Sequence, residues 1–464
     1  MSKLIIMCMI KNMDIRFQPN NTHLENATTF AKTDPHLKRL YAEKYIYHSP
    51  IIKELPRNEP GIITLGGGRQ IGKTTMLKQW MESLLDGGVP PQAICFFSGE
   101  LISDHQSLYY LIQQQLTQMP TKTLKYLILD EVTYIEQWDK TVKYLADIGA
   151  LEEVVLMLSG SDLVLIQDAR KRFPGRRGKA SKVDFHYYPL SFSEFLKLKN
   201  MFPPDIEEIN SLSEELAEML YSEFDQYLIH GGFLSAINDF AKNKSISIST
   251  LTTYSDWIRG DILKRNKKEI FLQEIVGSII KHYTKQISWN SLLKELSIDH
   301  TLTISDYISL LSAMDAVFVQ SAIIEDKLTA APKKQKKLMF CDPFIFHALS
   351  AWLNPVNDPY HEQIEPIFSD PQQYANLVES CVTTHFRRFF PTYYIKAEGE
   401  VDIAYVKNNR MWPVEVKWTT QLRSKDLKQI LKYKNGKIFA KIKNFSSIDH
   451  IPIQPLPWAL LMII

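Results

Sequence analysis

The stretch Gly67-Gly68-Arg69-Gln70-Ile71-Gly72-Lys73-Thr74 fits the phosphate-loop (Walker A) pattern G-x-x-x-x-G-K-[S/T]. It follows an apolar run at 62–65 and precedes a helix-like pattern that continues from Thr75. Glycines let backbone N–H groups turn toward a phosphate, and the start of a helix adds a partial positive charge. We therefore expect residues 67–75 to bind ATP, with the Lys73 ammonium at the β- and γ-phosphates and the Thr74 hydroxyl on Mg²⁺.

A second apolar run, at 126–129, ends in two carboxylates, Asp130 and Glu131. One further strand-like run, at 94–97, separates it from the phosphate loop along the chain. That order suits a parallel sheet in which an extra strand lies between the two motif strands. We predict that Asp130 holds Mg²⁺ through water and that Glu131 polarises the water that attacks the γ-phosphate.

Two later segments could act on the γ-phosphate. The run at 154–158 is followed by Ser159-Gly160-Ser161, and Ser161 is predicted to lie between the two motifs, where it could sense hydrolysis. Arg176, in the segment PGRRG, is predicted to stabilise charge on the transferring phosphate. Two ordinary alternatives stay open. Ser161 could be a cap or turn serine, and the arginine loop could be solvated, since it is crowded by Arg170, Lys171, Arg172 and Lys179.

Near the C-terminus, acidic residues and a lysine fall on two strand-like runs. Asp402 lies in the run 401–406, and Glu415 and Lys417 alternate onto one face of the next run. This arrangement resembles the PD-(D/E)xK nuclease pattern, and Glu379 matches the helix glutamate of some members. The resemblance implies that Glu379, Asp402 and Glu415 hold a divalent ion and that Lys417 offsets charge at the reacting phosphate. Glu398 or Glu400 could replace Asp402 as a ligand, and a hairpin with alternating charges would satisfy the same short pattern.

Residues 269–345 suggest a winged helix, with helices at 288–296 and 301–314 followed by strands at 317–324 and 338–341. No Lys or Arg occurs between Ser297 and Phe318, so phosphate contact would depend on the wing tip. The wing-tip cations are Lys333, Lys334, Lys336 and Lys337. A packing or protein-interaction role is the alternative. A basic helical stretch is predicted from Leu422. Residues 421–443 hold eight Lys or Arg and one acid, which favours DNA as a partner.

Together these segments resemble one protein family. The phosphate loop GGRQIGKTT, the strand end YLILDE followed by Trp138, the SGS turn, the GR loop and YPLSFSEFL occur in that order. They are followed by YLIHGGF at 227–233 and DPFIF at 342–346. The ordered set is similar to bacterial and archaeal AAA-type ATPases that append a winged-helix module and a C-terminal nuclease-like domain. The resemblance implies an ASCE-type P-loop core with Glu131 as the catalytic glutamate.

We expect an α/β fold built around a parallel-sheet P-loop core. Apolar runs at 62–65, 94–97, 126–129, 154–158 and 183–188 predict its five strands. Helical spacing at 192–199, 213–230 and 250–268 predicts a helical lid. The expected parts are a lead-in at 1–60, the AAA-type ATPase core at 61–190, the lid at 191–268, a winged-helix-like part at 269–345, a linker at 354–371 and a PD-(D/E)xK nuclease-like α/β domain at 372–464.

The composition is that of a globular protein without disulfides or membrane-spanning segments. The chain has 464 residues, 45% hydrophobic and 23% charged, as is ordinary for a globular protein, and a net charge of +2 that gives no argument for nucleic acid by itself. Cys8, Cys95, Cys341 and Cys381 lie far apart, which predicts free thiols in a reducing compartment. No segment reaches the ~18 apolar residues of a membrane span. We expect a cytoplasmic protein without a membrane partner.

The leading hypothesis is an ATPase that binds and hydrolyses ATP with Mg²⁺ and acts as a nucleotide-driven switch coupled to the nuclease-like, DNA-binding domain. One alternative is an ATP-gated interaction or regulatory protein whose nuclease-like domain is inactive. Another is a metal-dependent nuclease that ATP licenses. A protein partner or a homo-oligomer is compatible with each.

Overall fold

The computed structural model describes residues 13–161, 171, 173–204, 206 and 211–463. Cys8, Arg170 and Arg172 lie outside the described residues, as does the apolar run at 4–10. The three described cysteines are free thiols. The chain divides into two compact units, Met1–Tyr188 and Pro189–Ile464. Among the described helices, none is both long and apolar enough to cross a membrane.

The first unit contains the predicted five-stranded parallel sheet. Its strands are β1 (Gly61–Gly66), β2 (Ile94–Ser98), β3 (Lys125–Asp130), β4 (Val154–Gly160) and β5 (Asp184–His186). The order is β2-β3-β4-β1-β5, and every pairing is parallel. The α/β fold class is therefore confirmed, and β4 is the extra strand between the two motif strands. The carboxyl ends of β3, β4 and β1 consequently lie side by side.

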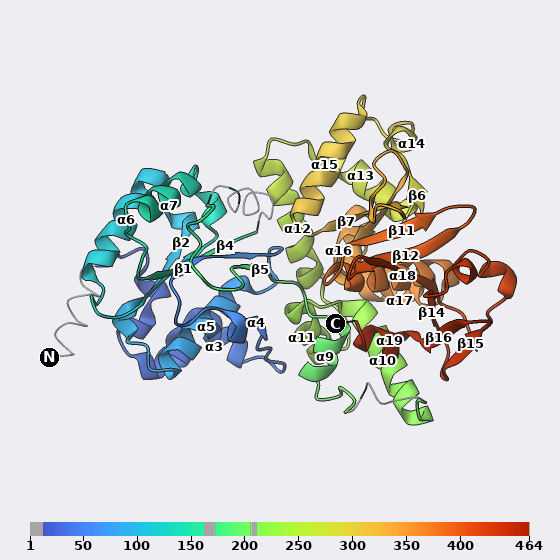
Figure 1. The fold of residues 1–464 in the computed structure, drawn as a ribbon, viewed down its shortest axis with the longest axis horizontal. Coiled ribbons are helices and arrows are strands. Elements are labelled where there is room, and N and C mark those ends of the chain that lie inside the picture. The colour runs from blue at the N-terminus through green and yellow to red at the C-terminus, as the bar shows by residue number, and fades with distance from the viewer. Residues whose placement is uncertain (1–12, 162–170, 172, 205, 207–210, 464) are drawn as a thin grey trace. The chain divides into compact units, whose positions relative to one another are not determined.

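Helices cover both faces of this sheet (Figure 1). On one face lie α6 (His105–Gln118) and α7 (Trp138–Asp147), and on the other lie α3 (Pro35–Tyr41), α4 (Ile51–Glu54) and α5 (Lys73–Asp86). Alternate residues of the strands point to opposite faces. Leu127, Leu129, Leu156 and Leu158 therefore share one buried core with side chains of α6 and α7.

The lead-in before β1 covers the edge of the sheet. Besides α3 and α4 it forms η1 (Gln18–Asn20), η2 (Thr22–Leu24), η3 (Ala27–Thr29) and α2 (Phe30–Thr33). The Asn21 side chain pairs with the edge strand β2, because its amide nitrogen donates to Phe96 O and its oxygen accepts from Phe96 N, each at 2.8 Å. This side chain satisfies backbone groups that an open sheet edge would leave unpaired.

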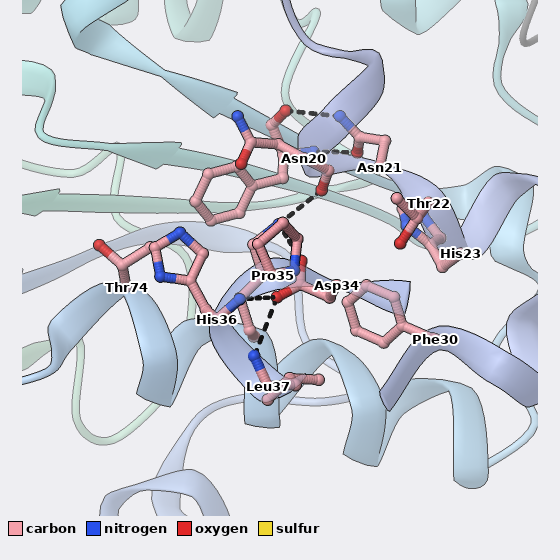
Figure 2. Close-up of polar contacts among 12 residues, drawn as sticks. Asn20, Asn21, Thr22, His23, Phe30, Asp34, Pro35, His36, Leu37 and Thr74 are labelled. Carbon is pink, nitrogen blue, oxygen red and sulfur yellow. Dashed lines mark hydrogen bonds and ion pairs between the residues drawn. The ribbon is translucent and has the colours of Figure 1, made fainter. Parts of the chain in front are cut away.

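A buried ion pair fastens the lead-in to the helix that follows the phosphate loop. Lys78 of α5 has no exposed side-chain surface, and its Nζ lies 3.2 Å from an Asp34 carboxylate oxygen and 3.8 Å from the centre of the Phe96 ring. It also donates to Asn20 O. Figure 2 shows Asp34 at the start of α3, where it accepts from the backbone N–H groups of His36 and Leu37. One carboxylate thus caps a helix and neutralises a buried cation.

The second unit begins with helices. These are α9 (Phe192–Leu198), α10 (Glu214–His230), α11 (Leu234–Asn243), α12 (Ile248–Lys264), α13 (Glu269–Lys281) and α16 (Pro343–Leu353). The first two agree with the predicted spans. The third predicted span ends at 268, whereas α12 ends at Lys264, and α11 was not predicted.

A three-stranded antiparallel sheet follows, with the order β6-β10-β7. It is formed by β6 (Gln286–Ile287), β7 (Val317–Ser321) and β10 (Lys336–Phe340), with α14 (Trp289–Leu293) and α15 (Thr301–Ala313) between the first two strands. A hairpin of β8 (Ile323–Ile324) and β9 (Thr329–Ala330) lies between β7 and β10. The small sheet meets the edge of a larger one through a bridge between Ala322 and Tyr394.

The larger sheet is mixed and six-stranded, in the order β11-β12-β13-β14-β16-β15. Its elements are β11 (Thr392–Lys396), β12 (Glu400–Lys407), β13 (Arg410–Lys417), β14 (Lys437–Ala440), β15 (Ser446–Ile448) and β16 (Ile451–Pro455), with α18 (Pro371–Arg387) and α19 (Leu456–Leu461). The sequence predicts a helix at 377–389, whereas α18 begins earlier, at Pro371. The predicted strands at 393–395, 401–406 and 412–416 correspond to β11, β12 and β13. The last three strands were not predicted.

Two expectations for this region are wrong. The predicted linker at 354–371 contains the π-helical turn η8 (Tyr360–Ile364) and α17 (Glu365–Ile367). The predicted basic helix consists of the turns η9 (Ser424–Asp426) and η10 (Ile430–Lys432) followed by strand β14. Asn435 and Gly436 interrupt the helical spacing of the charges, and Leu427 and Ile430 are buried.

Candidate functional site

The phosphate loop joins β1 to α5 and contains two glycines that a larger residue could not replace. Gly72 precedes the helix with a φ of 95°, in the left-handed region that side chains disfavour. At Gly67, an added Cβ would lie 2.3 Å from Tyr187 O. Lys73 is the first residue of α5, and its Nζ donates to Gly67 O at 3.1 Å and Gly68 O at 2.8 Å. The loop curls around the lysine that was predicted to meet the phosphates.

Asp130, at the end of β3, lies beside the predicted magnesium hydroxyl. Thr74 Oγ1 donates to Asp130 Oδ2 at 2.5 Å, and Ser159 Oγ donates to the other carboxylate oxygen. Burial and the charge of Glu131 raise the pKa of Asp130, against the opposing effect of these hydrogen bonds. A hydroxyl and a carboxylate side by side are the hard oxygen ligands that Mg²⁺ prefers, so these residues fit the ion.

Glu131 has a left-handed backbone, with φ 52°, and turns its carboxylate toward the loop. Its Oε1 lies 3.4 Å from Lys73 Nζ. Its Oε2 accepts from Ser161 N at 3.2 Å and from Ser161 Oγ at 3.1 Å. Burial alone would raise the pKa of Glu131, but the charges of Lys73 and Arg69 and the Ser161 hydrogen bond hold it below its ordinary value. An ionised carboxylate is the form that a general base requires.

Ser161 and Arg69 complete the polar group at the sheet end. Arg69 Nε donates to Ser161 Oγ at 3.2 Å, and its guanidinium lies 5.1 Å from the centre of the Tyr134 ring. The sequence prediction missed Ser159, which joins Asp130 to the Glu131 backbone by accepting from Glu131 N at 3.1 Å. The SGS turn was the available signal, and both of its serines contact the acidic strand end.

The remaining predicted residues of this unit lie as follows. Gln70 has a φ of 59°, Ile71 is buried, and Thr75 continues α5. Arg176 pairs with Asp147 at the end of α7. Its neighbour Arg177 instead pairs with Asp184 of β5 and donates to Ile62 O of β1 at 3.3 Å. Arg177 therefore stabilises the sheet, and the role of Arg176 stays a prediction.

In the second unit, the predicted metal ligands form a cluster with one additional acid. The carboxylate cluster comprises Glu379 of α18, Glu400 and Asp402 of β12, and Glu415 of β13. Asp402 Oδ2 accepts from Val416 N at 2.9 Å, which joins the two strands at this point. Lys417 Nζ donates to Glu415 Oε1 at 2.5 Å, so the predicted pair shares a face. Glu398, the other predicted alternative, is 87% exposed and pairs with Lys432.

Lys337 lies among three acids of the cluster, two of which, Glu379 and Asp402, were predicted metal ligands. Its Nζ lies 2.8 Å from Glu379 Oε1 and 3.7 Å from Asp402 Oδ1, and it pairs with Glu400. The side chain is 1% exposed, so the prediction that Lys337 belongs to an exposed wing tip is wrong. In the described ranges, no group of three or more His, Cys, Asp or Glu side chains is arranged to hold a metal ion. The predicted metal site of Glu379, Asp402 and Glu415 does not fit this arrangement.

Burial and neighbouring charges together shift the pKa values of the cluster residues. Burial would lower the pKa of Lys337, but the charges of Glu379, Asp402 and Glu400 raise it well above its ordinary value, and the ammonium is charged. Burial raises the pKa of Glu379 to about 7, against the opposing charge of Lys337. Burial and the charge of Asp402 raise the pKa of Glu415 to about 8.

The predicted DNA-contacting cations divide into exposed and engaged residues. Lys333 and Lys334 are exposed, whereas Lys336 donates to Ala331 O at 3.0 Å and Pro332 O at 3.2 Å. Within 421–443 the engaged cations include Lys432, Lys441, which lies 4.8 Å from the Trp418 ring centre, and Lys443, which pairs with Glu214. The exposed remainder includes Arg423, Lys425, Lys428 and Lys434.

Comparisons with known proteins agree with the phosphate-loop unit. Residues 59–196 match the family profile of the AAA domain, and residues 221–355 match a domain family of unknown function, DUF8612. An uncharacterized protein of Haemophilus influenzae is 28% identical over 264 residues, which are 54% of this chain and 60% of the relative. An uncharacterized protein of Methanocaldococcus jannaschii is 28% identical over 186 residues, 38% of each chain. The chain thus spans less than two thirds of either relative.

Several solved structures are similar at low identity. A Walker-type ATPase of Pyrococcus abyssi is 15% identical, covering 62% of this chain and 91% of its own, with a TM-score of 0.39. The Aeropyrum pernix ORC1 protein, solved in complex with DNA, is 12% identical, covering 68% and 92%, with a TM-score of 0.29. A Thermotoga maritima RuvB mutant is 14% identical, covering 60% and 84%, with a TM-score of 0.30.

Proposed function

We propose that this protein binds ATP with Mg²⁺ at residues 67–75 and hydrolyses it, so that nucleotide state acts as a switch on the second unit. One observation carries the proposal: Lys73, Thr74, Asp130, Glu131 and Ser161 meet at the carboxyl ends of three adjacent parallel strands. Ligands of open α/β sheets bind at this edge. The AAA-domain match over 59–196 supports the same conclusion independently.

Each of these side chains has a task that its present contacts suit. Lys73, now bonded to loop carbonyls, would turn to the β- and γ-phosphates, which are stronger partners for an ammonium. Thr74 and Asp130 would hold Mg²⁺, which supplies charge neutralisation at the phosphates when bound. Glu131 would accept a proton from the attacking water, and Ser161 would fix the direction of its carboxylate.

Two substitutions test the ATPase proposal. Lys73→Ala should abolish tight ATP binding, because the phosphates lose their cation. Glu131→Gln should keep binding but slow steady-state hydrolysis by ~10²–10⁴-fold, the usual value of a general base. Glu136→Gln is the matched control, since Glu136 is an exposed glutamate of the same loop. Hydrolysis by Glu131→Gln at the rate of the control would remove Glu131 from the mechanism.

For the second unit we propose a winged-helix-like part at 269–345 and a nuclease-like part at 372–464 that contacts DNA without cutting it. The order helix, helix, strand, strand in α14, α15, β7 and β10 supports the first. The exposed cations of 421–443 support DNA contact. The lysine in the carboxylate cluster favours a non-cutting role over the alternative of a metal-dependent nuclease.

DNA-stimulated hydrolysis tests this coupling. We expect duplex DNA to raise the rate of ATP turnover, and we expect no cleavage of labelled DNA with Mg²⁺ and ATP. Cleavage that disappears in Asp402→Asn and Lys417→Ala would establish the nuclease alternative. Stimulation by another protein but not by DNA would favour the interaction protein. The proposal has two further parts. Arg176 acts on the nucleotide of a neighbouring copy in a homo-oligomer, and the protein is located in the cytoplasm.

A further inference from the structure

The chain itself supplies hydrogen-bond donors to each acid of the carboxylate cluster, although Glu415 Oε2 is buried without a partner among the described residues. Glu379 and Glu400 face Lys337, Asp402 accepts from Val416 N, and Glu415 accepts from Lys417. Gln286 of β6 also donates to Glu400. A buried carboxylate without such partners would be strongly destabilising, so the cluster requires a cation at its centre.

The central position can hold an ammonium or a metal ion, but not both. A divalent ion would need cluster oxygens at ~2.0–2.6 Å. Oxygens of Glu379, Glu400 and Asp402 now lie around Lys337 Nζ, and Glu415 pairs with Lys417. The ammonium is 2.8 Å from Glu379 Oε1 and 3.7 Å from Asp402 Oδ1, which are hydrogen-bond and ion-pair distances. Two cations at this spacing would repel each other in a buried site, where the repulsion is poorly screened.

Lys337 comes from a different sheet than Glu400 and Asp402, two of the acids it neutralises. It lies on β10, whereas Glu400 and Asp402 lie on β12 of the six-stranded sheet. Other hydrogen bonds also join the three-stranded sheet to the six-stranded sheet. Gln320 of β7 donates to Tyr393 O and to Asp402 O, each at 2.9 Å, and Tyr394 donates to Gln335 O at 2.8 Å. Gln320 is fully buried.

We propose that Lys337 is the resident cation of the carboxylate cluster, taking the place of a divalent metal ion and fastening the three-stranded sheet to the six-stranded sheet. The cluster is then a structural clamp. Acids that match the nuclease pattern then form the joint between two parts of the second unit, and metal binding there would require β10 to release its lysine. The proposal does not depend on ATP hydrolysis, which uses other residues.

Metal uptake and thermal unfolding of the full-length chain test this clamp. Every protein carries Asp130→Asn, so that the phosphate loop contributes no metal site, and no nucleotide is present. Titration calorimetry with Mn²⁺ should show no uptake by the protein with Lys337 intact. Uptake of one Mn²⁺ that is lost on adding Asp402→Asn would overturn the proposal, because metal would then occupy the cluster despite the lysine.

The unfolding temperature supplies the second measurement. Lys337→Met removes the charge but keeps an unbranched side chain, and we expect the unfolding temperature to fall by roughly 10 °C, the scale for breaking a buried ion pair. Lys334→Met, an exposed lysine of the preceding turn, should leave it unchanged. If Lys337→Met fails to fold, the double variant with Glu400→Gln should recover folding, because Glu400 pairs with Lys337 and one uncompensated charge is removed. Unfolding of Lys337→Met at the control temperature, or no recovery in the double variant, would refute the clamp.

Discussion

The histidine at position 385 should make the second unit sensitive to acid. His385 of α18 is buried, with Nδ1 2.7 Å from Cys381 O and Nε2 3.0 Å from the backbone nitrogen of Phe192. A backbone N–H can only donate, so Nε2 must accept and the proton must sit on Nδ1. Both contacts are satisfied only by the neutral ring. Protonation would set an N–H against the N–H of Phe192, at the start of α9.

The size of the effect follows from the pKa. Burial, assisted by the charge of Arg388, lowers the pKa of His385 from 6.5 to about 3. The unfolded chain therefore binds a proton at higher pH than the folded chain does, and stability is lost as pH falls from 6.5 toward 3. At pH 5 the unfolded histidine is largely protonated and the folded one is not, which costs about 2 kcal/mol.

Urea unfolding at pH 7 and pH 5, followed by circular dichroism, measures this cost. His385→Gln keeps an acceptor and a donor but carries no charge at either pH. Between the two pH values the parent should lose about 2 kcal/mol more than this variant. His450→Gln, which replaces an exposed histidine, is the control and should behave as the parent does. Equal losses in the parent and in His385→Gln would show that the ring is not held neutral by these contacts.

Two further predictions concern the first unit. Ser159→Ala removes the hydroxyl that joins Asp130 to the backbone of Glu131. Because a ligand loses an orienting partner, the Mg²⁺ concentration for half-maximal ATPase activity should rise by ~10–100-fold. An unchanged Mg²⁺ requirement would contradict this prediction. Lys78→Met leaves Asp34 buried without its cation. The free energy of unfolding, measured in urea, should fall by about 3–5 kcal/mol and should recover in part when Asp34→Asn is added. Additive losses in the double variant would argue against an ion pair between the two residues.

Much of the fold was predictable because its signals are local. Strands β1 to β4 are apolar runs without alternation, the pattern of strands covered on both faces, and each lies within a residue or two of its predicted bounds. Strand β14 was missed because its four residues, KIFA, follow lysines at helical spacing. Helix α11 was missed because its buried face is only weakly apolar, with Ala236, Ile237 and Asn238 as its buried residues.

The candidate site likewise has a part that local sequence predicts and a part that depends on contacts between strands. A phosphate loop is a backbone structure formed by consecutive residues, so the pattern itself predicts which atoms meet. Ser159 acts across two strands, because β4 lies beside β3 and its end brings a hydroxyl to Asp130. That contact depends on strand order and on which of two serines points to the acid. The SGS turn predicts a polar group there and does not decide between Ser159 and Ser161.

The burial of Lys337 could not be predicted from the sequence. It also reduces the number of lysines that the wing can offer to DNA. In the run KKQKK the four lysines look alike, yet Lys333 and Lys334 precede β10 and are exposed, while Lys337 lies within it and is buried. Each neutralised phosphate contributes ~0.9 to the slope of log affinity against log salt. Lys333 and Lys334 together therefore allow a slope of about 2, whereas the six exposed cations within 421–443, two of which pair with nearby acids, allow about 5. Of these two segments, the C-terminal one is therefore expected to contribute the larger share of any salt dependence of DNA binding.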